Sequence, residues 1–206
     1  MAGLPVGVIA IDGKTVRHTG RKSGAKAAIH MVSAFAARQR LVLGQVKVAE
    51  KSNEVLAIAK LLDMVAIVTI DAMGCQRGIS QKVVDKKADY VLVLKGNQGS
   101  LRDGVELYAT EQKAKDFADT KISQNTTVDS DHGRVERRCS PDIETRTTTV
   151  IHDVKWLQGH HWPGLKSVVI VESSREISGR TEQETRYYIT SLVMLAALMG
   201  LRDSHI

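Results

Sequence analysis

Aromatic residues, paired cysteines and long apolar runs are scarce in this sequence. Each scarcity argues against a class of structure or binding mode. Aromatics make up 4% of 206 residues, so stacking of bases on aromatic platforms is not the expected mode of nucleic-acid binding. Cys75 and Cys139 form no CxxC pair, which predicts free thiols in a reducing compartment. The apolar stretch 192–201 is too short to span a bilayer. With no signal peptide before the first apolar run, we expect a cytoplasmic protein without membrane contact.

Acidic residues are missing from one long stretch, between Asp12 and Glu50. Because the whole chain has a net charge of +6 and this stretch alone carries +8, the remaining residues sum to −2. The positive charge therefore gathers beside Asp12, as a site for a polyanion requires. A solvated charged hairpin is the alternative interpretation. The basic residues of the stretch are Lys14, Arg17, Arg21, Lys22, Lys26, Arg38, Arg40 and Lys47.

The order of apolar segments predicts an α/β fold with a mixed sheet. Three strand-like runs, at about 6–11, 29–37 and 41–49, predict three antiparallel strands. A helix from Ser52, a strand over 66–70, a helix over about 76–87 and a strand over 90–94 then predict a βαβ unit with a parallel pair. This order of three antiparallel strands followed by βαβ is that of a ribonuclease-H-like fold.

The rest of the chain changes character after a polar helix over about 100–117. Residues 119–190 are rich in strand-like segments, which include 166–173 and 184–191, and an apolar helix is expected from 192 to 201. We therefore predict a single domain over 1–206. It would consist of a ribonuclease-H-like core (1–118), a β-rich insertion on the same sheet (119–190) and the start of a C-terminal helix (191–206).

Two aspartates follow apolar strands of the predicted sheet. Asp12 comes after Val6-Gly-Val-Ile-Ala-Ile11, and Asp71 comes after Ala66-Ile-Val-Thr-Ile70. Carboxylates at the carboxyl ends of buried strands lie at the rim where α/β proteins place their chemistry. Two of them from neighbouring strands can share a divalent cation, which indicates phosphoryl transfer. Asp12-Gly13 is also a common turn and Asp71 could cap the next helix, so only the pair is informative.

Further segments are candidate contacts to DNA. Lys95 and Asn97, in Lys95-Gly-Asn-Gln98, follow strand 90–94 on the same rim as Asp71 and could hold a phosphate, with a simple turn as the alternative. Arg134 and Arg137 lie in a basic segment that fits either a DNA-facing surface or a solvated edge. The predicted DNA-binding residues are therefore Lys14, Arg17, Arg21, Lys22, Lys26, Lys95, Asn97, Arg134 and Arg137.

Two nucleotide-binding motifs are excluded. Gly13-Lys-Thr15 is not a P-loop, because that motif requires four residues between its glycines and the nearest preceding glycine is Gly7. No GxGxxG is present either, so a dinucleotide-binding fold has no support.

Several longer segments together carry a resemblance that spans nearly the whole chain. They are Ile9-Ala-Ile-Asp-Gly-Lys14, His30-Met-Val-Ser-Ala-Phe-Ala36, Leu41-Val-Leu-Gly-Gln45, Lys51-Ser-Asn-Glu54, Ile67-Val-Thr-Ile-Asp-Ala-Met-Gly-Cys-Gln76, Ala88-Asp-Tyr-Val-Leu-Val-Leu-Lys-Gly-Asn-Gln98, His132-Gly-Arg-Val-Glu-Arg137, Trp162-Pro-Gly-Leu165 and Tyr187-Tyr-Ile-Thr-Ser-Leu192. In these segments the chain resembles the H-repeat-associated, ISAs-type insertion-sequence transposases.

The resemblance implies a DDE transposase catalytic domain, which cleaves and joins double-stranded DNA at transposon ends. Asp12 and Asp71 match the family's first two catalytic acids, which with a third carboxylate hold two Mg²⁺ (or Mn²⁺) ions about 3.5–4 Å apart. The implied partners are transposon-end DNA and a second subunit, in a homodimer or in a mixed oligomer with an intact transposase. The implied location is the cytoplasm, in association with the nucleoid.

The sequence departs from the family pattern at both ends. The family's catalytic glutamate lies in an Arg-x-His-Trp-x-Ile-Glu-Asn context, whereas this sequence stops at Arg202-Asp-Ser-His-Ile206. The family's amino-terminal helical region also has no counterpart. We therefore expect a truncated catalytic domain that is weak or inactive alone, with Glu182, Glu184 and Asp203 as disfavoured substitutes for the third acid. The alternatives are a non-catalytic DNA-binding remnant that modulates an intact transposase, and a standalone Mg²⁺ nuclease.

Overall fold

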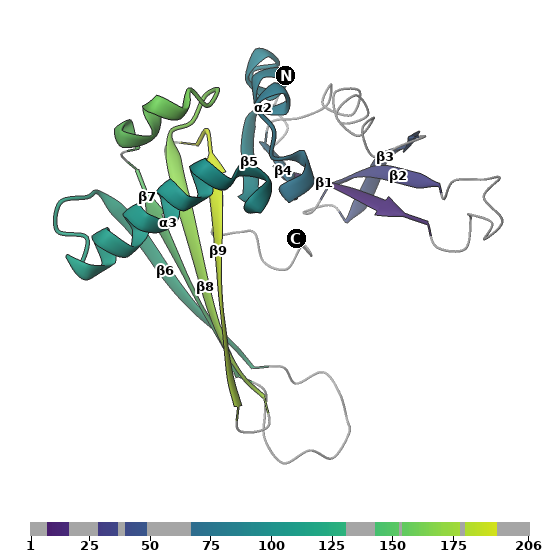
Figure 1. Cartoon of the computed structure of the whole chain (residues 1–206). Coiled ribbons are helices and arrows are strands. Elements are labelled where there is room, and N and C mark those ends of the chain that lie inside the picture. Colours follow the sequence, from purple (N-terminus) through teal and green to yellow (C-terminus); the bar gives the residue numbers. More distant parts are fainter. Residues whose placement is uncertain are drawn as a thin grey trace, which may run out of the picture.

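A single mixed sheet organises the part of the chain that the structure describes. The computed structural model describes residues 8–16, 29–36, 40–48, 67–130, 143–152, 154–177 and 180–192. Within them, nine strands pair in the order β3-β2-β1-β4-β5-β9-β8-β7-β6 (Figure 1). The predicted α/β class is therefore confirmed. Among these residues, no helix has both the length and the apolar character needed to cross a membrane.

The first five strands have the pairing that the sequence predicts. β1 is antiparallel to β2, and β2 is antiparallel to β3. β1 is parallel to β4, and β4 is parallel to β5, with α2 as the connection between the last two. The helix predicted from Ser52 lies outside the described residues. The bounds are β1 Val8–Thr15, β2 His30–Ala36, β3 Leu41–Val48, β4 Ile67–Ile70, α2 Arg77–Asp85 and β5 Asp89–Leu94.

The second half of the chain extends the same sheet. β9 pairs antiparallel with β5, and β8, β7 and β6 follow outward as antiparallel neighbours. The predicted β-rich segment is thus built onto the edge of the first five strands. The bounds are η3 Ala72–Gly74, η4 Gly96–Gln98, α3 Gly99–Ala114, β6 Ile122–Ser130, β7 Ile143–Ile151, η5 Lys155–His160, β8 Ser167–Ile177 and β9 Arg180–Thr190.

The helices bury their apolar residues on one face of the sheet. In α3, Leu101, Val105 and Ala109 are buried at a spacing of four residues, which places them on one side of the helix. In α2, Ile79 and Val83 have the same spacing. These side chains belong to the larger hydrophobic cluster, and α3 crosses strands β6–β9 in front of the sheet (Figure 1).

The opposite face of the sheet has a smaller apolar cluster that includes no residue of α2, α3 or η5. Its buried members on the central strands include Ile67, Val91, Val93 and Tyr188. The two sheet faces are thus different, and α2, α3 and η5 contribute apolar residues only to the first. Strand alternation places Asp12, within β1, on this second face.

Buried polar groups join β5 to β9. The Ser191 hydroxyl donates to Asp89 Oδ1 (2.7 Å) and accepts from the Tyr90 backbone amide (3.0 Å). The Thr190 hydroxyl donates to the Tyr90 carbonyl (2.6 Å), and the Tyr90 hydroxyl donates to the Pro163 carbonyl (2.7 Å). Because each of these groups has a partner, this junction avoids the cost of unsatisfied buried polar atoms.

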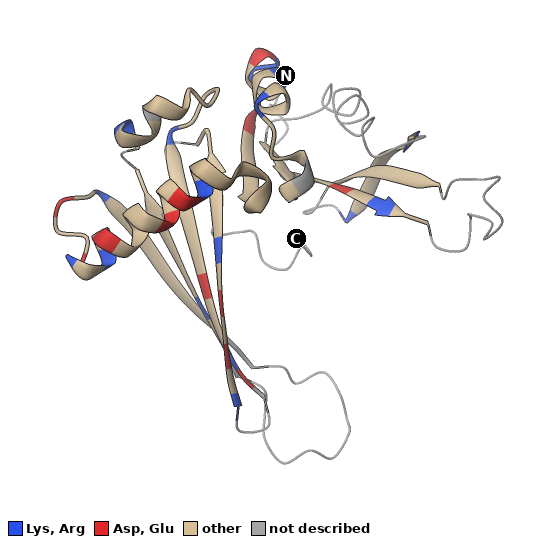
Figure 2. Cartoon of the chain, in the orientation of Figure 1, with Lys and Arg blue, Asp and Glu red and all other residues tan. Residues whose placement is uncertain are grey.

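β8 and β9 are longer than the sequence predicts. The predicted strands over 166–173 and 184–191 become two 11-residue strands. Residues 180–186 of β9 are exposed, and Figure 2 shows charges of both signs along these strands. A strand without a buried face has no hydrophobic alternation, so its hairpin pairing could not be read from the sequence pattern.

A glycine turn beside this junction provides a stability test. Gly164 has a φ of +68°, and a Cβ there would lie 2.7 Å from Val84 Cγ2. We predict that Gly164→Ala lowers the free energy of unfolding by about 2–4 kcal/mol, through the left-handed backbone and the steric overlap. Urea denaturation followed by circular dichroism measures this change.

The matched control is Gly78→Ala in α2, where a Cβ meets nothing within 4 Å. It should stabilise the protein by up to about 1 kcal/mol. Equal midpoints for the two variants would contradict the predicted packing of Gly164.

Candidate active site

The register between β1 and β4 brings the two aspartates together. The last parallel pair is Ile11 with Ile70, so Asp12 and Asp71 are the next residues on adjacent strands. Neighbouring strands lie about 4.7–4.9 Å apart. Ile9 and Ile11 face the helices, whereas Val8 belongs to the opposite cluster. The alternation of strand side chains therefore places Asp12 on the face opposite α2 and α3.

The position of Asp12 corrects one sequence-based expectation. Asp12 does not follow the end of its strand but lies within β1, paired with Ser33 of β2. The reason is that β1 has two neighbours of different extent. Its parallel pairing with β4 stops at Ile11, whereas its antiparallel pairing with β2 continues to Thr15. Asp12 is still the first residue beyond the part of β1 that pairs with β4.

Polar and basic side chains continue the same face across β2 and β3. Ser33, the partner of Asp12, accepts a hydrogen bond from Gln45 Nε2 (3.1 Å). Two residues along β1, Lys14 pairs with Met31, which in turn pairs with Lys47. Because in-register strand residues share a face, Lys14 and Lys47 lie on the side of Asp12. Both are exposed, so positive charge does border the aspartates, and Lys47 was not among the predicted DNA contacts.

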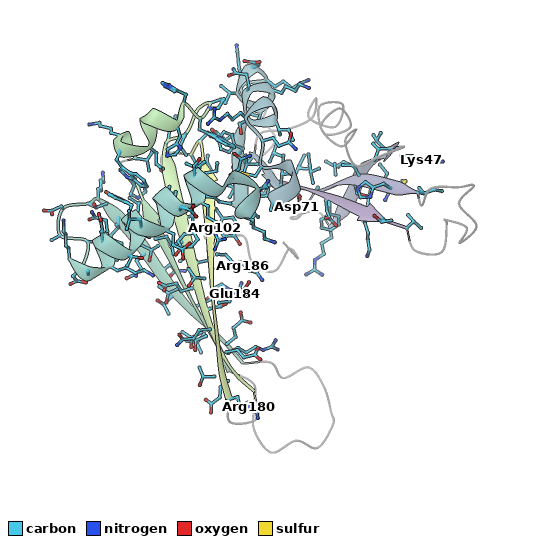
Figure 3. All side chains as sticks on the ribbon, viewed as in Figure 1. Lys47, Asp71, Arg102, Arg180, Glu184 and Arg186 are labelled. Carbon is cyan, nitrogen blue, oxygen red and sulfur yellow. The ribbon has the colours of Figure 1, made fainter. Side chains whose placement is uncertain are left out.

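Asp71 leads directly into a short, well-anchored loop. The Gly74 amide lies 3.1 Å from the Asp71 carbonyl and 3.4 Å from Asp71 Oδ1. Cys75 is fully buried, and burial raises the pKa of its thiol to about 12. Figure 3 shows Asp71 where β4 enters this loop, beside β1. The half-buried Asp71 is therefore held by the Gly74 amide, and the loop that follows it is anchored by the buried Cys75.

The turn after β5 contacts this loop. Asn97 Nδ2 donates to the Ala72 carbonyl (2.5 Å), and Gln98 Nε2 donates to the Cys75 carbonyl (3.0 Å). The Asn97 amide nitrogen therefore has a partner within the protein, and its predicted contact with DNA stays a prediction. Lys95 is exposed at the start of the same turn. No sequence pattern indicates these contacts, because they join segments more than twenty residues apart.

Glu184 is not placed to complete the site. Asp71 and Val93 each come one residue after the Ile70–Leu92 pair, and Val93 pairs with Tyr188 of β9. Glu184 lies four residues from Tyr188 along β9, which at 3.3 Å per residue separates the two residues by about 13 Å. It accepts two hydrogen bonds from the Arg186 guanidinium (2.8 and 3.0 Å), which lower the pKa of its carboxyl (Figure 3).

The remaining predicted residues are not described. Arg17, Arg21, Lys22, Lys26, Arg134 and Arg137 lie outside the described residues, as does Asp203. Among the residues that are described, no group of three or more His, Cys, Asp or Glu side chains could hold a metal ion. The β1–β4 register thus puts Asp12 and Asp71 directly after the same residue pair, whereas the shared site and the wider DNA surface stay predictions.

Comparison with known proteins gives a consistent group of relatives. The family described as "Transposase DDE domain" matches residues 5–194. The chain is 39% identical over 188 residues to an "Uncharacterized protein in dhlA 3'region" of Xanthobacter autotrophicus, covering 89% of this chain and 59% of that protein. It is 42% identical over 193 residues to "Putative transposase YncI" of Escherichia coli O157:H7, covering 89% and 47%.

A third relative is named "H repeat-associated putative transposase YhhI" in Escherichia coli K12. It is 36% identical over 197 residues, which cover 92% of this chain and 50% of that protein. The chain therefore spans about half the length of the curated relatives that it matches.

The first prediction from this geometry concerns divalent cations. If Asp12 and Asp71 share an ion, 10 mM Mg²⁺ should raise the melting temperature by about 3 °C for a Kd of about 1 mM. Asp12→Asn and Asp71→Asn should each abolish this rise, because either change removes a ligand charge. Differential scanning calorimetry measures it. The matched control, Asp103→Asn on α3, should keep the rise, and a rise that persists in Asp71→Asn would exclude the shared ion.

The second prediction concerns the buried thiol. Because burial raises the pKa of Cys75 to about 12, the thiol stays protonated at pH 8 and shielded from reagents. In a Cys139→Ser background, Ellman's reagent at pH 8 should react with Cys75 only after denaturation in urea. Stoichiometric reaction of the folded protein within minutes would show that the loop after Asp71 is open.

Proposed function

Because the chain belongs to the family of transposase DDE domains, we propose that it serves metal-dependent phosphoryl transfer on DNA at insertion-sequence ends. The observation that supports this proposal is the β1–β4 register, in which Asp12 and Asp71 are the residues that directly follow the last parallel pair, Ile11 with Ile70. The two aspartates match the first two acids of the catalytic triad in the resemblance described above. Transposition cleaves a phosphodiester bond at the transposon end, and the freed 3′-hydroxyl then attacks a target phosphodiester and displaces its 3′-oxygen; metal ions held by clustered carboxylates are suited to that chemistry.

A ribonuclease-H-like core is the fold that we propose for residues 1–118. Its support is the strand order β3-β2-β1-β4-β5, with an antiparallel β1–β2–β3 unit followed by parallel β4 and β5. Residues 119–190 would be the β-rich insertion, supported by the outward series β9-β8-β7-β6. The C-terminal helix proposed to start in 191–206 lies almost entirely outside the described residues.

The donor set at the aspartates fits a hard divalent cation. Carboxylate oxygens are ligands that Mg²⁺ and Mn²⁺ prefer, and the thiol of Cys75, four residues after Asp71, is fully buried. When bound, such ions would activate a water or 3′-hydroxyl and stabilise the leaving oxygen. The role of Asp12 and Asp71 is to bind and orient these ions, and Lys14 and Lys47 would hold the DNA backbone beside them.

Double-stranded DNA at transposon ends is the proposed substrate. The basic stretch between Asp12 and Glu50 supports it, since phosphate neutralisation dominates DNA affinity. A DNA substrate also implies action at the nucleoid in the cytoplasm. We propose a homodimer, or a mixed oligomer with an intact transposase, as the working assembly.

Reduced activity of the isolated chain is part of the proposal. The sequence matches two of the family's three catalytic carboxylates, and the described residues contain no third one grouped with them. We therefore propose that this chain alone cleaves DNA weakly or not at all. A non-catalytic DNA-binding role, in which the chain modulates a complete transposase, is the second candidate that this observation favours.

Both candidate functions require DNA binding, so a binding assay tests what they have in common. A labelled insertion-sequence-end duplex should bind the chain in gel-shift assays, with affinity that falls steeply between 50 and 200 mM salt. Lys14→Glu and Lys47→Glu should each weaken binding about tenfold, because they reverse charge on the Asp12 face. Lys115→Glu, after α3, is the matched control and should have little effect. Binding that ignores salt and both substitutions would contradict the proposed surface.

Cleavage of the same duplex separates the two candidates. Any Mg²⁺-dependent nicking should disappear in Asp71→Asn and persist in Asp103→Asn, which would establish the catalytic role. Tight binding without nicking in the unsubstituted chain would establish the non-catalytic one. Nicking that needs neither Mg²⁺ nor Asp71 would refute the assignment of this site.

A further inference from the structure

Two side-chain amides connect the turn after β5 to the loop after β4. Asn97 and Gln98 are consecutive, and each donates to a backbone carbonyl of the other segment, Ala72 (2.5 Å) and Cys75 (3.0 Å) respectively. The two acceptors belong to the first and the fourth residue after Asp71. The turn thus holds both ends of the short segment that leaves the proposed metal ligand.

This segment in turn orients Asp71. The Ala72 carbonyl accepts from the Cys75 amide (3.2 Å) as well as from Asn97. Between these residues, the Gly74 amide points at the Asp71 carbonyl (3.1 Å) and lies 3.4 Å from Asp71 Oδ1. Fixing the two carbonyls therefore fixes the amide that faces the carboxylate. This is a chain of contacts from the β5 turn to one aspartate oxygen.

The turn that supplies the amides is itself rigidly supported. The backbone amide of Gln98 donates to the Lys95 carbonyl (3.1 Å) and closes η4. α3 begins at the next residue, Gly99, and Leu101 in its first turn is buried in the larger core. The support of Asp71 therefore comes from a helix packed on the other face of the sheet. Functional groups held by such supporting contacts keep their geometry better than groups on free loops.

We propose that Asn97 and Gln98 are positioning residues, which hold the Asp71 loop so that its carboxylate meets a metal ion together with Asp12. The inference rests on the proposed function, since it assigns how the same site is kept in register. Neither side chain touches the substrate in this role. Each acts through a carbonyl, and for that it must provide an N–H donor, which an amide has and a carboxylate lacks.

Because the positioning role requires an N–H donor, the direction of the change in Mn²⁺ affinity distinguishes it from an electrostatic effect. Asn97→Asp and Gln98→Glu keep shape but remove the donor and add negative charge near the proposed ion. A merely electrostatic influence would tighten Mn²⁺ binding. The positioning role predicts the reverse, a loss of Mn²⁺ affinity of about tenfold or more, which is typical when supporting partners of metal ligands are removed. Electron paramagnetic resonance titration of the full chain with Mn²⁺ measures the free ion directly.

Two further measurements separate positioning from a general loss of structure. Amide hydrogen exchange should become faster in residues 72–76 of both variants and stay unchanged in β7 and β8. Asn97→Gln retains an amide and should keep more Mn²⁺ affinity than Asn97→Asp. Gln124→Glu on β6 is the matched control, because Gln124 also donates an amide hydrogen bond, to Thr149 Oγ1 (3.0 Å), far from the aspartates. Its Mn²⁺ affinity should equal that of the unsubstituted chain.

The possible results are distinguishable. Weaker Mn²⁺ binding with faster exchange in 72–76 supports the inference. Unchanged or tighter binding in Asn97→Asp and Gln98→Glu, at a site that Asp71→Asn abolishes, overturns the inference and leaves the proposed function intact. The absence of any Mn²⁺ site that depends on Asp71 in the unsubstituted chain overturns both.

Discussion

The parallel register between β1 and β4 is the constraint on which the candidate site depends. Because Ile11 pairs with Ile70, Asp12 and Asp71 lie side by side, and a slip of one residue would turn one carboxylate to the helix-covered face. The buried side chains of Ile9, Ile11, Val68 and Ile70 enforce this register, since all four belong to the larger core. The apolar residues that fold the sheet thus also set the spacing of the two acids.

The asymmetry of the sheet explains why two carboxylates can sit there. α2, α3 and η5 contribute their apolar residues to one cluster, and Asp12 lies on the other face, near exposed Lys14 and Lys47. Charge repulsion between neighbouring carboxylates is costly in a dry core and smaller where solvent, a cation or basic side chains are close. The helices therefore stabilise the sheet from behind, and α3 also anchors the turn whose amides reach the Asp71 loop.

Much of this arrangement could be predicted from the sequence, for identifiable reasons. The strands before Asp12 and Asp71 are short, apolar runs, and their order along the chain predicted the βαβ unit that the structure contains. The predicted end of β1 was wrong, because only the pairing with β2 extends this strand past Asp12. The lengths of β8 and β9 were underestimated, because residues 180–186 show no alternation of hydrophobic and polar side chains. The support of the Asp71 loop by Asn97 was missed because it is a contact between loops.

Anomalous diffraction from crystals of the chain grown with Mn²⁺ tests the central claim, that Asp12 and Asp71 share one divalent ion, most directly. Our account predicts an anomalous peak on the face opposite α2 and α3, with carboxylate oxygens of both residues about 2.1 Å away. A peak bound to only one of the two aspartates, or manganese bound elsewhere while the pair stays empty at saturating concentration, would contradict it.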